Sequence, residues 1–446
     1  MSKEIIVKIR DDREPVKFDV SSESPRKFKP QTGAQHSWGN ESEFGSEKLR
    51  RRIEPWLTAL FQSEHFSLLI GTGLTYAICS LAGQEDFDLP TPNFGKFQQK
   101  ITDATGVSDK KQATATIEKQ LNVANELLTG LRHLQSPEED INSLRCNISK
   151  FLGEFSRYIL GLEGNISTST RRDEAFGFLV NFLMSFASRS GTRERLQIFT
   201  TNYDRVIEAG AEMAGLHLLD RFVGNIAPIF RSSRLNIDMH YNPPGIRGEP
   251  RYLEGVACFT KLHGSIDWIN AGKDIRRIGL PFGAESIEPH LHALGIEDDN
   301  FHRLMIYPNS AKDKETAEYP YVELFRDFAT SVCRPNSSLV TYGYGFGDDH
   351  INRVIADMLT IPSTHLVIIS NDDPLGRIMK FYENLSRPAQ TTILIGEHFG
   401  DLKSLVSHYL PKPAIDRITI RMADLLKSRL TVMPERDSNE TVGDET

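Results

Sequence analysis

Short apolar runs recur along the chain without the alternation of a half-exposed strand. They lie at residues 66–70, 196–200, 258–262, 303–307, 338–342, 365–370 and 391–395. Continuous apolar runs of this length are typical of strands that are buried on both faces of a parallel sheet. The pattern therefore predicts an α/β protein whose core is a parallel sheet.

Residues 113–190 instead place apolar side chains at helical spacing. The three stripes are Ile117, Leu121, Ala124, Leu128 and Leu131; Ile148, Phe151, Phe155, Tyr158 and Leu162; and Phe176, Leu179, Val180 and Leu183. We interpret them as core seams of a helical layer inserted at about 105–192, between the first two core strands. Such a layer suits a lid over the sheet or a surface for self-assembly.

The two ends of the chain differ from this core in composition. Residues 4–10 suit a short strand, but the polar stretch from Ser21 to Glu47 predicts a linker or mobile arm, so we assign 1–55 to an N-terminal arm. The acidic end from Pro434 predicts a disordered tail over 434–446. The remainder, 56–433, is expected to form one domain with its insertion.

Composition narrows the class of partner. The 446 residues carry a formal net charge of −8, which argues against binding nucleic acid or an anionic membrane over the whole surface. No stretch approaches the roughly 18 apolar residues of a membrane span, and the charged start lacks the apolar core of a signal peptide. We therefore expect a cytoplasmic protein.

The cysteines bear on metal chemistry. Cys79, Cys146, Cys258 and Cys333 are widely separated, and none belongs to a C-x-x-C pair. Because structural zinc ribbons require such closely spaced pairs, the sequence predicts no zinc and no other metal site, and buried free thiols are the simpler interpretation.

The first apolar run breaks directly into a glycine-rich turn, Gly71-Thr72-Gly73-Leu74-Thr75, before a predicted helix. Glycines let the backbone approach a pyrophosphate, and the first N–H groups of a helix supply donors and a partial positive charge. A tight strand-to-helix turn without a ligand is the structural alternative.

Four later apolar runs also end in polar residues, at 199–204, 261–265, 342–348 and 368–372. In a doubly wound sheet the ligand lies outside the carboxyl ends of the strands, so these segments are predicted to converge on one crevice. Their order, Thr201-Asn202-Tyr203-Asp204, His263-Gly264-Ser265, Gly343-Tyr344-Gly345 and Ser370-Asn371 after the glycine turn, resembles the sirtuin pattern. It is more closely similar to bacterial sirtuin-like proteins of anti-phage defence, in which TTNYD, LHGS and GYGFGDxHIN are typical.

The resemblance covers about residues 60–400 and implies a sirtuin-type Rossmann-like fold with a large helical insertion. It further implies that Asn202 positions the nicotinamide ribose of NAD and a water, that Asp204 supports this loop, and that His263 is the general base on a ribose hydroxyl. The cofactor contacts that it implies are Gly71, Thr72, Gly73, Thr75, Thr201, Ser265, Gly343, Gly345, Phe346, Asn371 and Asp372.

Asparagine and histidine suit the cleavage of NAD at its nicotinamide–ribose bond, whatever the family of the protein. Cleavage of the nicotinamide–ribose bond develops an oxocarbenium ion, which requires a fixed ribose and a nearby base. Histidine titrates close to neutral pH, and an amide holds a water without a charge that needs its own partner.

Each residue also has a structural alternative. Asn202 suits a strand-end turn, His263 a structural histidine and Asp204 a helix cap. Asp348 and Asp349 are expected to be caps of a helix over 351–359, and His290, His292 and His302 to belong to a solvated lid rather than a metal site.

The chain departs from protein-deacylating sirtuins in two places. It lacks the four-cysteine zinc module after the histidine motif, and its glycine turn continues into Tyr76-Ala77-Ile78-Cys79 rather than a GIPxFR extension. These departures favour water as the acceptor, which gives nicotinamide and ADP-ribose. The resemblance implies a defence effector that depletes NAD+, forms a homo-oligomer, and is controlled by assembly or by a HerA-type ATPase partner.

Other functions stay open. A protein deacylase or an ADP-ribosyltransferase would need an acyl-peptide or protein acceptor, and a non-catalytic NAD-binding scaffold would not need both Asn202 and His263. A dehydrogenase is disfavoured because Thr75 and Tyr76 stand where the third glycine of GxGxxG would come.

The cysteine spacing generates a first prediction. Because no cysteine pairs are present, the fold should not depend on zinc, and the purified protein should hold none in stoichiometric amount. Circular dichroism in excess chelator should match the untreated spectrum. Elemental analysis that finds one tightly held zinc per chain, with unfolding on its removal, would contradict this prediction.

Overall fold

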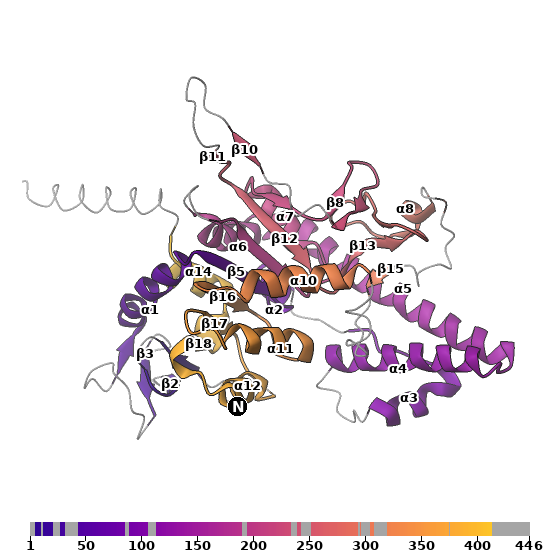
Figure 1. Ribbon diagram of the computed structural model, residues 1–446, viewed down its shortest axis with the longest axis horizontal. Coiled ribbons are helices and arrows are strands. Elements are labelled where there is room, and N and C mark those ends of the chain that lie inside the picture. Colours follow the sequence, from indigo (N-terminus) through magenta and orange to yellow (C-terminus); the bar gives the residue numbers. More distant parts are fainter. Residues whose placement is uncertain are drawn as a thin grey trace, which may run out of the picture.

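The computed structural model describes residues 5–9, 12–20, 27–31, 43–84, 89–105, 113–189, 194–232, 239–241, 251–292, 295, 304–306, 319–373 and 375–412. Figure 1 shows a central sheet with helices on both faces and a helical arm that extends to one side. The protein is therefore an α/β protein with a Rossmann-like arrangement, as the apolar runs predicted.

The central sheet has eleven strands in the order β4-β3-β2-β1-β18-β17-β16-β5-β6-β12-β7. All strands from β18 to β7 run parallel. They are β18 (Thr391–Ile395), β17 (His365–Ser370), β16 (Ser337–Tyr342), β5 (His65–Ile70), β6 (Leu196–Thr200), β12 (Val256–Lys261) and β7 (His217–Leu219). Six of the predicted apolar runs match strands of this parallel set.

Each face of the sheet is covered by its own helices and core. Leu68, Ile70 and Val340 face α1 (Ser46–Phe61), α2 (Gly73–Leu81), α6 (Arg172–Ala187), α7 (Val206–Met213), α13 (Glu397–Gly400) and α14 (Leu402–His408). Leu69 and Leu339 face α10 (Tyr321–Val332), α11 (Asp349–Met358) and α12 (Arg377–Leu385). Because adjacent residues of a strand point to opposite faces, a strand covered on both faces is mostly apolar, and Ser67 is the one polar residue of the run 66–70.

The strand order reverses between β5 and β16. The chain proceeds from β5 through β6 and β12 on one side, and from β16 through β17 and β18 on the other. The loops that follow neighbouring strands therefore diverge at this point and leave a crevice at their carboxyl ends.

The first 55 residues differ from the expected arm. β1 (Ile5–Lys8) pairs antiparallel with β18, and β2 (Val16–Val20), β3 (Lys27–Pro30) and β4 (Phe44–Gly45) extend the same sheet. The prediction of a linker between Ser21 and Glu47 was therefore wrong at β3 and β4, which are strands of the sheet and bury Phe28 and Phe44. Two isolated aromatic residues in polar sequence were too weak a signal for a strand.

The apolar run at 303–307 is a strand, but it lies outside the parallel sheet. β15 (Leu304–Ile306) pairs antiparallel with β13 (Gly264–Asn270) in a five-stranded sheet of order β15-β13-β14-β9-β8. The other members of this five-stranded sheet are β14 (Ile275–Arg277), β9 (Ile229–Phe230) and β8 (Phe222–Val223). In a separate pair, β10 (His240–Tyr241) lies antiparallel to β11 (Arg251–Tyr252). The expectation that 303–307 belongs to the main core was wrong.

The helical arm in Figure 1 contains α3 (Gln98–Thr105), α4 (Ala113–His133) and α5 (Glu138–Thr168). Its first two predicted stripes pack with each other and with the small sheet. The third stripe, on α6, packs instead against the main sheet. Because these stripes are mostly buried within the chain, they do not by themselves supply a surface for self-assembly.

The remaining short helices are η1 (Gly95–Phe97), α8 (Glu288–His292) and η4 (Pro388–Gln390). Within the described part of the chain, no helix has both the length and the apolar character that crossing a membrane would require.

A half-buried histidine, His365, lies at the start of β17. His365 Nε2 is 2.8 Å from Thr392 Oγ1, and Trp56 Nε1 donates to that same oxygen at 3.0 Å. Burial, reinforced by the charge of Lys8, lowers the pKa of His365 to about 4. The neutral ring accepts the Thr392 hydroxyl hydrogen, which leaves the oxygen to accept from Trp56.

This histidine predicts a pH-dependent stability. Between pH 6.5 and 4 the unfolded chain binds a proton at His365 that the folded chain does not, so stability is lost as the pH falls through this window. Between pH 7 and 5 the free energy of unfolding should fall by about 2 kcal/mol more for the wild-type protein than for the His365→Gln variant, as measured by urea denaturation. His217→Gln, at an exposed position on β7, is the control. Equal pH dependence in wild type and His365→Gln would refute the assignment.

Candidate active site

Two adjoining cavities lie at the carboxyl ends of the parallel strands. The inner cavity has a volume of about 190 Å³ and the outer one about 1070 Å³. The loops after β5 and β16 border both, through Thr72, Gly343, Tyr344 and Gly345. The crevice expected at the switch point is therefore a two-part site.

The loops after β5 and β16 approach each other through backbone. A Cβ added at Gly71 would lie 2.4 Å from the Gly343 carbonyl oxygen, and one at Gly73 would lie 2.5 Å from Gly343 Cα. Gly343 itself has φ of +61°. The amides of Gly71 and Gly73 donate to Tyr342 O and Gly343 O, at 3.0 and 3.1 Å. These two N–H groups therefore hold the loops together rather than pointing to a ligand.

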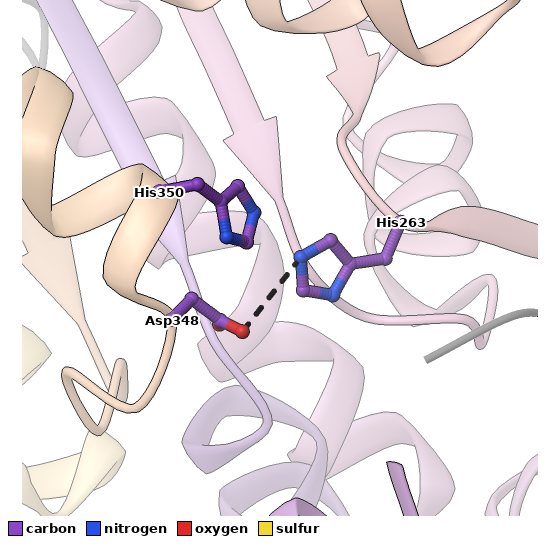
Figure 2. A group of neighbouring side chains, drawn as sticks. All are labelled: His263, Asp348 and His350. Carbon is purple, nitrogen blue, oxygen red and sulfur yellow. Dashed lines mark ion pairs between the residues drawn. The ribbon is translucent and has the colours of Figure 1, made fainter. Parts of the chain in front are cut away.

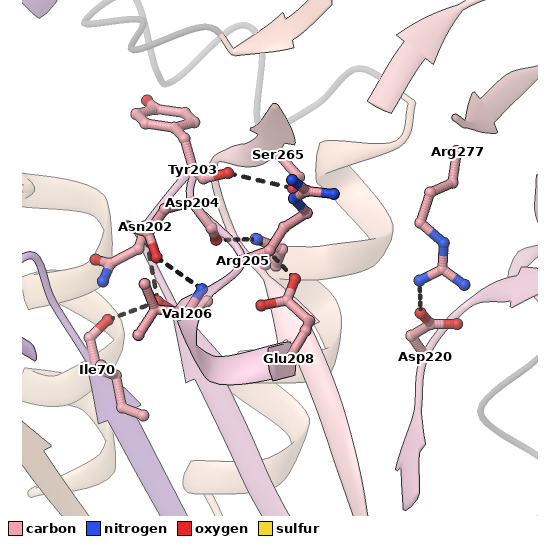
Figure 3. Close-up of polar contacts among 12 residues, drawn as sticks. Ile70, Asn202, Tyr203, Asp204, Arg205, Val206, Glu208, Asp220, Ser265 and Arg277 are labelled. Carbon is pink, nitrogen blue, oxygen red and sulfur yellow. Dashed lines mark hydrogen bonds and ion pairs between the residues drawn. The ribbon is translucent and has the colours of Figure 1, made fainter. Parts of the chain in front are cut away.

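Asn202 has a fixed orientation in the loop after β6, which Figure 3 shows. Its Nδ2 donates to Gly71 O at 3.1 Å and to Thr75 Oγ1 at 3.0 Å. A flipped amide would place Oδ1 against the Gly71 carbonyl, so the network defines which atom is oxygen. Oδ1 is buried and accepts no hydrogen bond from the described residues. It is an acceptor available to a ligand in the inner cavity.

Asp204 supports this arrangement. Its Oδ2 accepts from Thr75 Oγ1 at 2.7 Å, and its Oδ1 accepts from the Val206 amide at 3.1 Å, at the start of α7. The carboxylate thus both caps a helix and orients the Thr75 hydroxyl that receives Asn202. The structure makes it a positioning residue, because both oxygens already serve the protein.

His263 lies in the turn between β12 and β13 and borders the inner cavity. Gly264, which directly follows His263, has φ of +90° and so allows the chain to turn sharply after the histidine. His263 Nε2 is 4.0 Å from Asp348 Oδ1, and its ring centroid is 5.7 Å from that of His350 (Figure 2). Figure 2 shows Asp348 and His350 coming from the start of α11 toward the histidine.

The helical arm supplies an apolar wall. Phe155, Tyr158, Ile159 and Leu162 of α5 all line the inner cavity. A wall of this kind excludes water from one side and suits a planar aromatic ring.

A buried ion pair joins α5 to Arg205, which follows the loop that holds Asn202. Arg205 donates to Glu163 Oε2 at 2.5 Å through Nη2 and to Oε1 at 3.2 Å through Nε, and the Arg205 amide donates to Oε1 at 2.8 Å. Arg205 also donates to the carbonyl oxygens of Leu280 and Pro281. Burial raises the pKa of the Glu163 carboxyl, against the opposing effect of Arg205. Loss of either partner would leave a buried charge unpaired, which is costly.

Arg377 lies where the two cavities meet. It is the first residue of α12, it lines both cavities, and among their described lining residues it is the only lysine or arginine. Gly347 makes room for it, because a Cβ there would lie 2.9 Å from Arg377 Nη1. A guanidinium at this junction is suited to a phosphate group.

The outer cavity is lined by Asn371 and Asp372, which follow β17, and by the acidic side chains Asp373, Glu397 and Asp401. A Cβ at Gly400 would lie 2.2 Å from Asn371 Cα, so the end of α13 packs directly against Asn371. This cavity offers acceptors for hydroxyl groups and an environment unfavourable to added negative charge.

Most residues that the sequence suggested converge on these cavities, but two do not line either one. Ser265 is fully buried and donates to Tyr203 O at 3.3 Å, as Figure 3 shows. Phe346 is buried between Tyr344 and Phe381, with ring centroids 4.8 Å away in each case. Ser265 and Phe346 therefore belong to the motifs through their packing beneath the loops, and not through a place on the cavity walls.

Asp348 differs from the cap that the sequence predicted. It occupies the N-cap position of α11, but its side chain makes no capping hydrogen bond and instead approaches His263. His290 and His292 lie on α8 and do not line the cavities, and His302 lies outside the described residues.

Sequence reasoning gave no role to His350 or to Arg377. His350 lies inside the GYGFGDxHIN segment that carries the resemblance, but it follows two aspartates at a helix start, where caps are expected. Arg377 opens a helix outside the glycine motifs, and its only signal was its position after the polar segment that follows β17.

The sequence model of one family, described as the SIR2-like domain, matches residues 196–387. This range holds the loops of Asn202, His263, Gly343 and Asn371, and it supports a sirtuin-like protein with an NAD-related activity. No curated protein matched the chain.

The glycine contact generates a prediction about stability. Gly343→Ala and Gly71→Ala each place a methyl group into backbone, so each should lower the free energy of unfolding by at least about 2 kcal/mol. Gly345→Ala is the matched control in the same loop, because no atom lies within 4 Å of its added Cβ. Thermal denaturation that gives Gly343→Ala the stability of Gly345→Ala would show that the contact is not close.

Proposed function

We propose that this chain is an NAD+ hydrolase that produces nicotinamide and ADP-ribose. The observation that carries the proposal is the orientation of Asn202, whose donors are used by Gly71 and Thr75 while its buried Oδ1 remains an acceptor in the cavity that His263 also lines. An acceptor and a base in one apolar-walled cavity match the needs of glycosidic cleavage.

The two cavities suit the two halves of NAD+. The nicotinamide riboside half fits the inner cavity, where α5 provides the apolar wall. The adenosine half fits the larger outer cavity, where Asn371 and Asp372 accept ribose hydroxyl hydrogens. Arg377 at the junction then neutralises the pyrophosphate.

The reaction breaks the bond between ribose C1′ and the nicotinamide nitrogen, and the electron pair leaves with neutral nicotinamide. The oxocarbenium ion that develops is shielded by α5, and water adds its oxygen to C1′. Asn202 Oδ1 accepts a hydrogen from this water or from the ribose and so orients it. One proton is released, and His263 accepts it as general base, with Asp348 Oδ1 4.0 Å from its Nε2.

Water as the acceptor is supported by the absence of paired cysteines after His263, where β13 follows directly. A deacylase or ADP-ribosyltransferase remains the alternative, and a non-catalytic scaffold the second. Hydrolysis that depletes NAD+ would be toxic to the cell, so we place the protein as the effector of a bacterial anti-phage defence system. Its restraint would come from homo-oligomeric assembly or from a partner such as a HerA-type ATPase.

The proposal predicts the effect of removing either central group. His263→Ala and Asn202→Ala should each lower kcat for nicotinamide release by at least roughly 10², because each loses a group positioned on the reacting ribose. Chromatography of NAD+, nicotinamide and ADP-ribose measures this, and circular dichroism checks the fold. His217→Ala, at an exposed position, is the control.

Hydrolysis near the wild-type rate by folded His263→Ala would overturn the assignment of the base. Transfer of an acyl group or of ADP-ribose to a peptide, in preference to water, would favour the alternative enzyme classes. Binding of NAD+ without any turnover, in the presence and absence of a partner, would favour the scaffold.

A further inference from the structure

Three potential metal ligands meet at one edge of the inner cavity. One ligand atom each from His263, Asp348 and His350 lies within 4.8 Å of the other two (Figure 2). Among the described residues, no other group of three histidine, cysteine or acidic side chains comes this close. The sequence did not suggest the cluster, because His263 and Asp348 lie 85 residues apart along the chain.

The donor set selects a class of ion. Two imidazole nitrogens and one carboxylate oxygen suit zinc and related transition metals, whereas magnesium and calcium prefer oxygen ligands. Zinc bonds of 2.0–2.2 Å place tetrahedral ligands about 3.4 Å apart. His263 Nε2 and Asp348 Oδ1 are 4.0 Å apart and all three ligand atoms lie within 4.8 Å of one another, so binding an ion requires them to approach by up to about 1.4 Å.

The surroundings hold the ligands and leave a route for the ion. His263 and His350 are both buried, and Phe325 packs edge-on against His350 with ring centroids 4.6 Å apart. Asp348 and His263 border the inner cavity. Three protein ligands beside a cavity leave a fourth position for water, as in open zinc sites.

We propose that His263, Asp348 and His350 bind one divalent ion of the zinc class and that this ion inhibits the enzyme. Binding itself depends only on the three side chains, whereas the inhibition rests on the proposed NAD+ hydrolysis. A bound ion occupies a lone pair of His263, so the ring no longer accepts a proton. It also places positive charge beside the site where an oxocarbenium ion develops, which raises the barrier.

The ion at this site is exchangeable. The ligands come from a turn and a helix start that are packed without it, so the fold does not require the metal. The purified protein is therefore expected to hold no stoichiometric zinc and to bind the ion when it is supplied.

Cobalt(II) titration of the full chain, after treatment with chelator, tests the site directly. We expect one ion per chain with the visible absorption of a tetrahedral complex, displaced by zinc. His350→Gln should weaken binding by at least about tenfold, since even the loss of an outer partner of a metal ligand costs that much. His292→Gln, at an exposed histidine of α8, is the matched control. Asp348→Asn is a second variant in case the buried His350 position does not tolerate glutamine.

NAD+ hydrolysis is then measured in chelator and with added zinc. We expect zinc to abolish wild-type turnover at one equivalent and to leave turnover of His350→Gln largely intact. Absence of one-to-one binding, or binding unaffected by both His350→Gln and Asp348→Asn, would overturn the site. Binding as described together with no hydrolysis in chelator would uphold the site and overturn the proposed function instead.

Discussion

The site depends on one steric constraint, the backbone contact between the loops after β5 and β16. Gly71 and Gly73 meet Gly343 at distances that no Cβ could share. This contact closes the crevice at the switch point and divides it into an inner and an outer cavity. Because the Gly71 carbonyl also receives Asn202 Nδ2, the same contact determines which way the Asn202 amide faces. The glycines thus act first on the protein's own backbone, and the positive charge where the two cavities meet comes from Arg377.

A second set of buried polar contacts places the helical arm. The pair of Glu163 with Arg205 joins α5 to the residue that directly follows the Asn202 loop, and the carbonyls of Leu280 and Pro281 complete its bonds. Buried pairs contribute little net stability, but they are specific about geometry. The apolar wall of the inner cavity is therefore held in a defined position relative to the polar loops.

The parallel sheet was predictable because a strand buried on both faces is mostly apolar without alternation, as in 66–70 and 365–370. The convergence of the Asn202 and His263 loops followed from the same topology. The place of 303–307 was not predictable, because an apolar run does not specify its partner strand. The side chain of Asp348 was assigned to a cap by local rules, yet it faces His263 across the site. His350 and Arg377 belong to helix starts, and only the tertiary structure brings them to the cavities.

The central claim is that the inner cavity holds the nicotinamide ribose between Asn202 and His263. The most direct measurement is a crystal structure of the full chain with carba-NAD+, in which a carbon replaces the ribose ring oxygen and cleavage is blocked. The account predicts the nicotinamide against α5, a ribose hydroxyl or water on Asn202 Oδ1, His263 facing the ribose, and the pyrophosphate at Arg377. A structure with the adenosine half in the inner cavity, or with the analogue bound away from both residues, would contradict it.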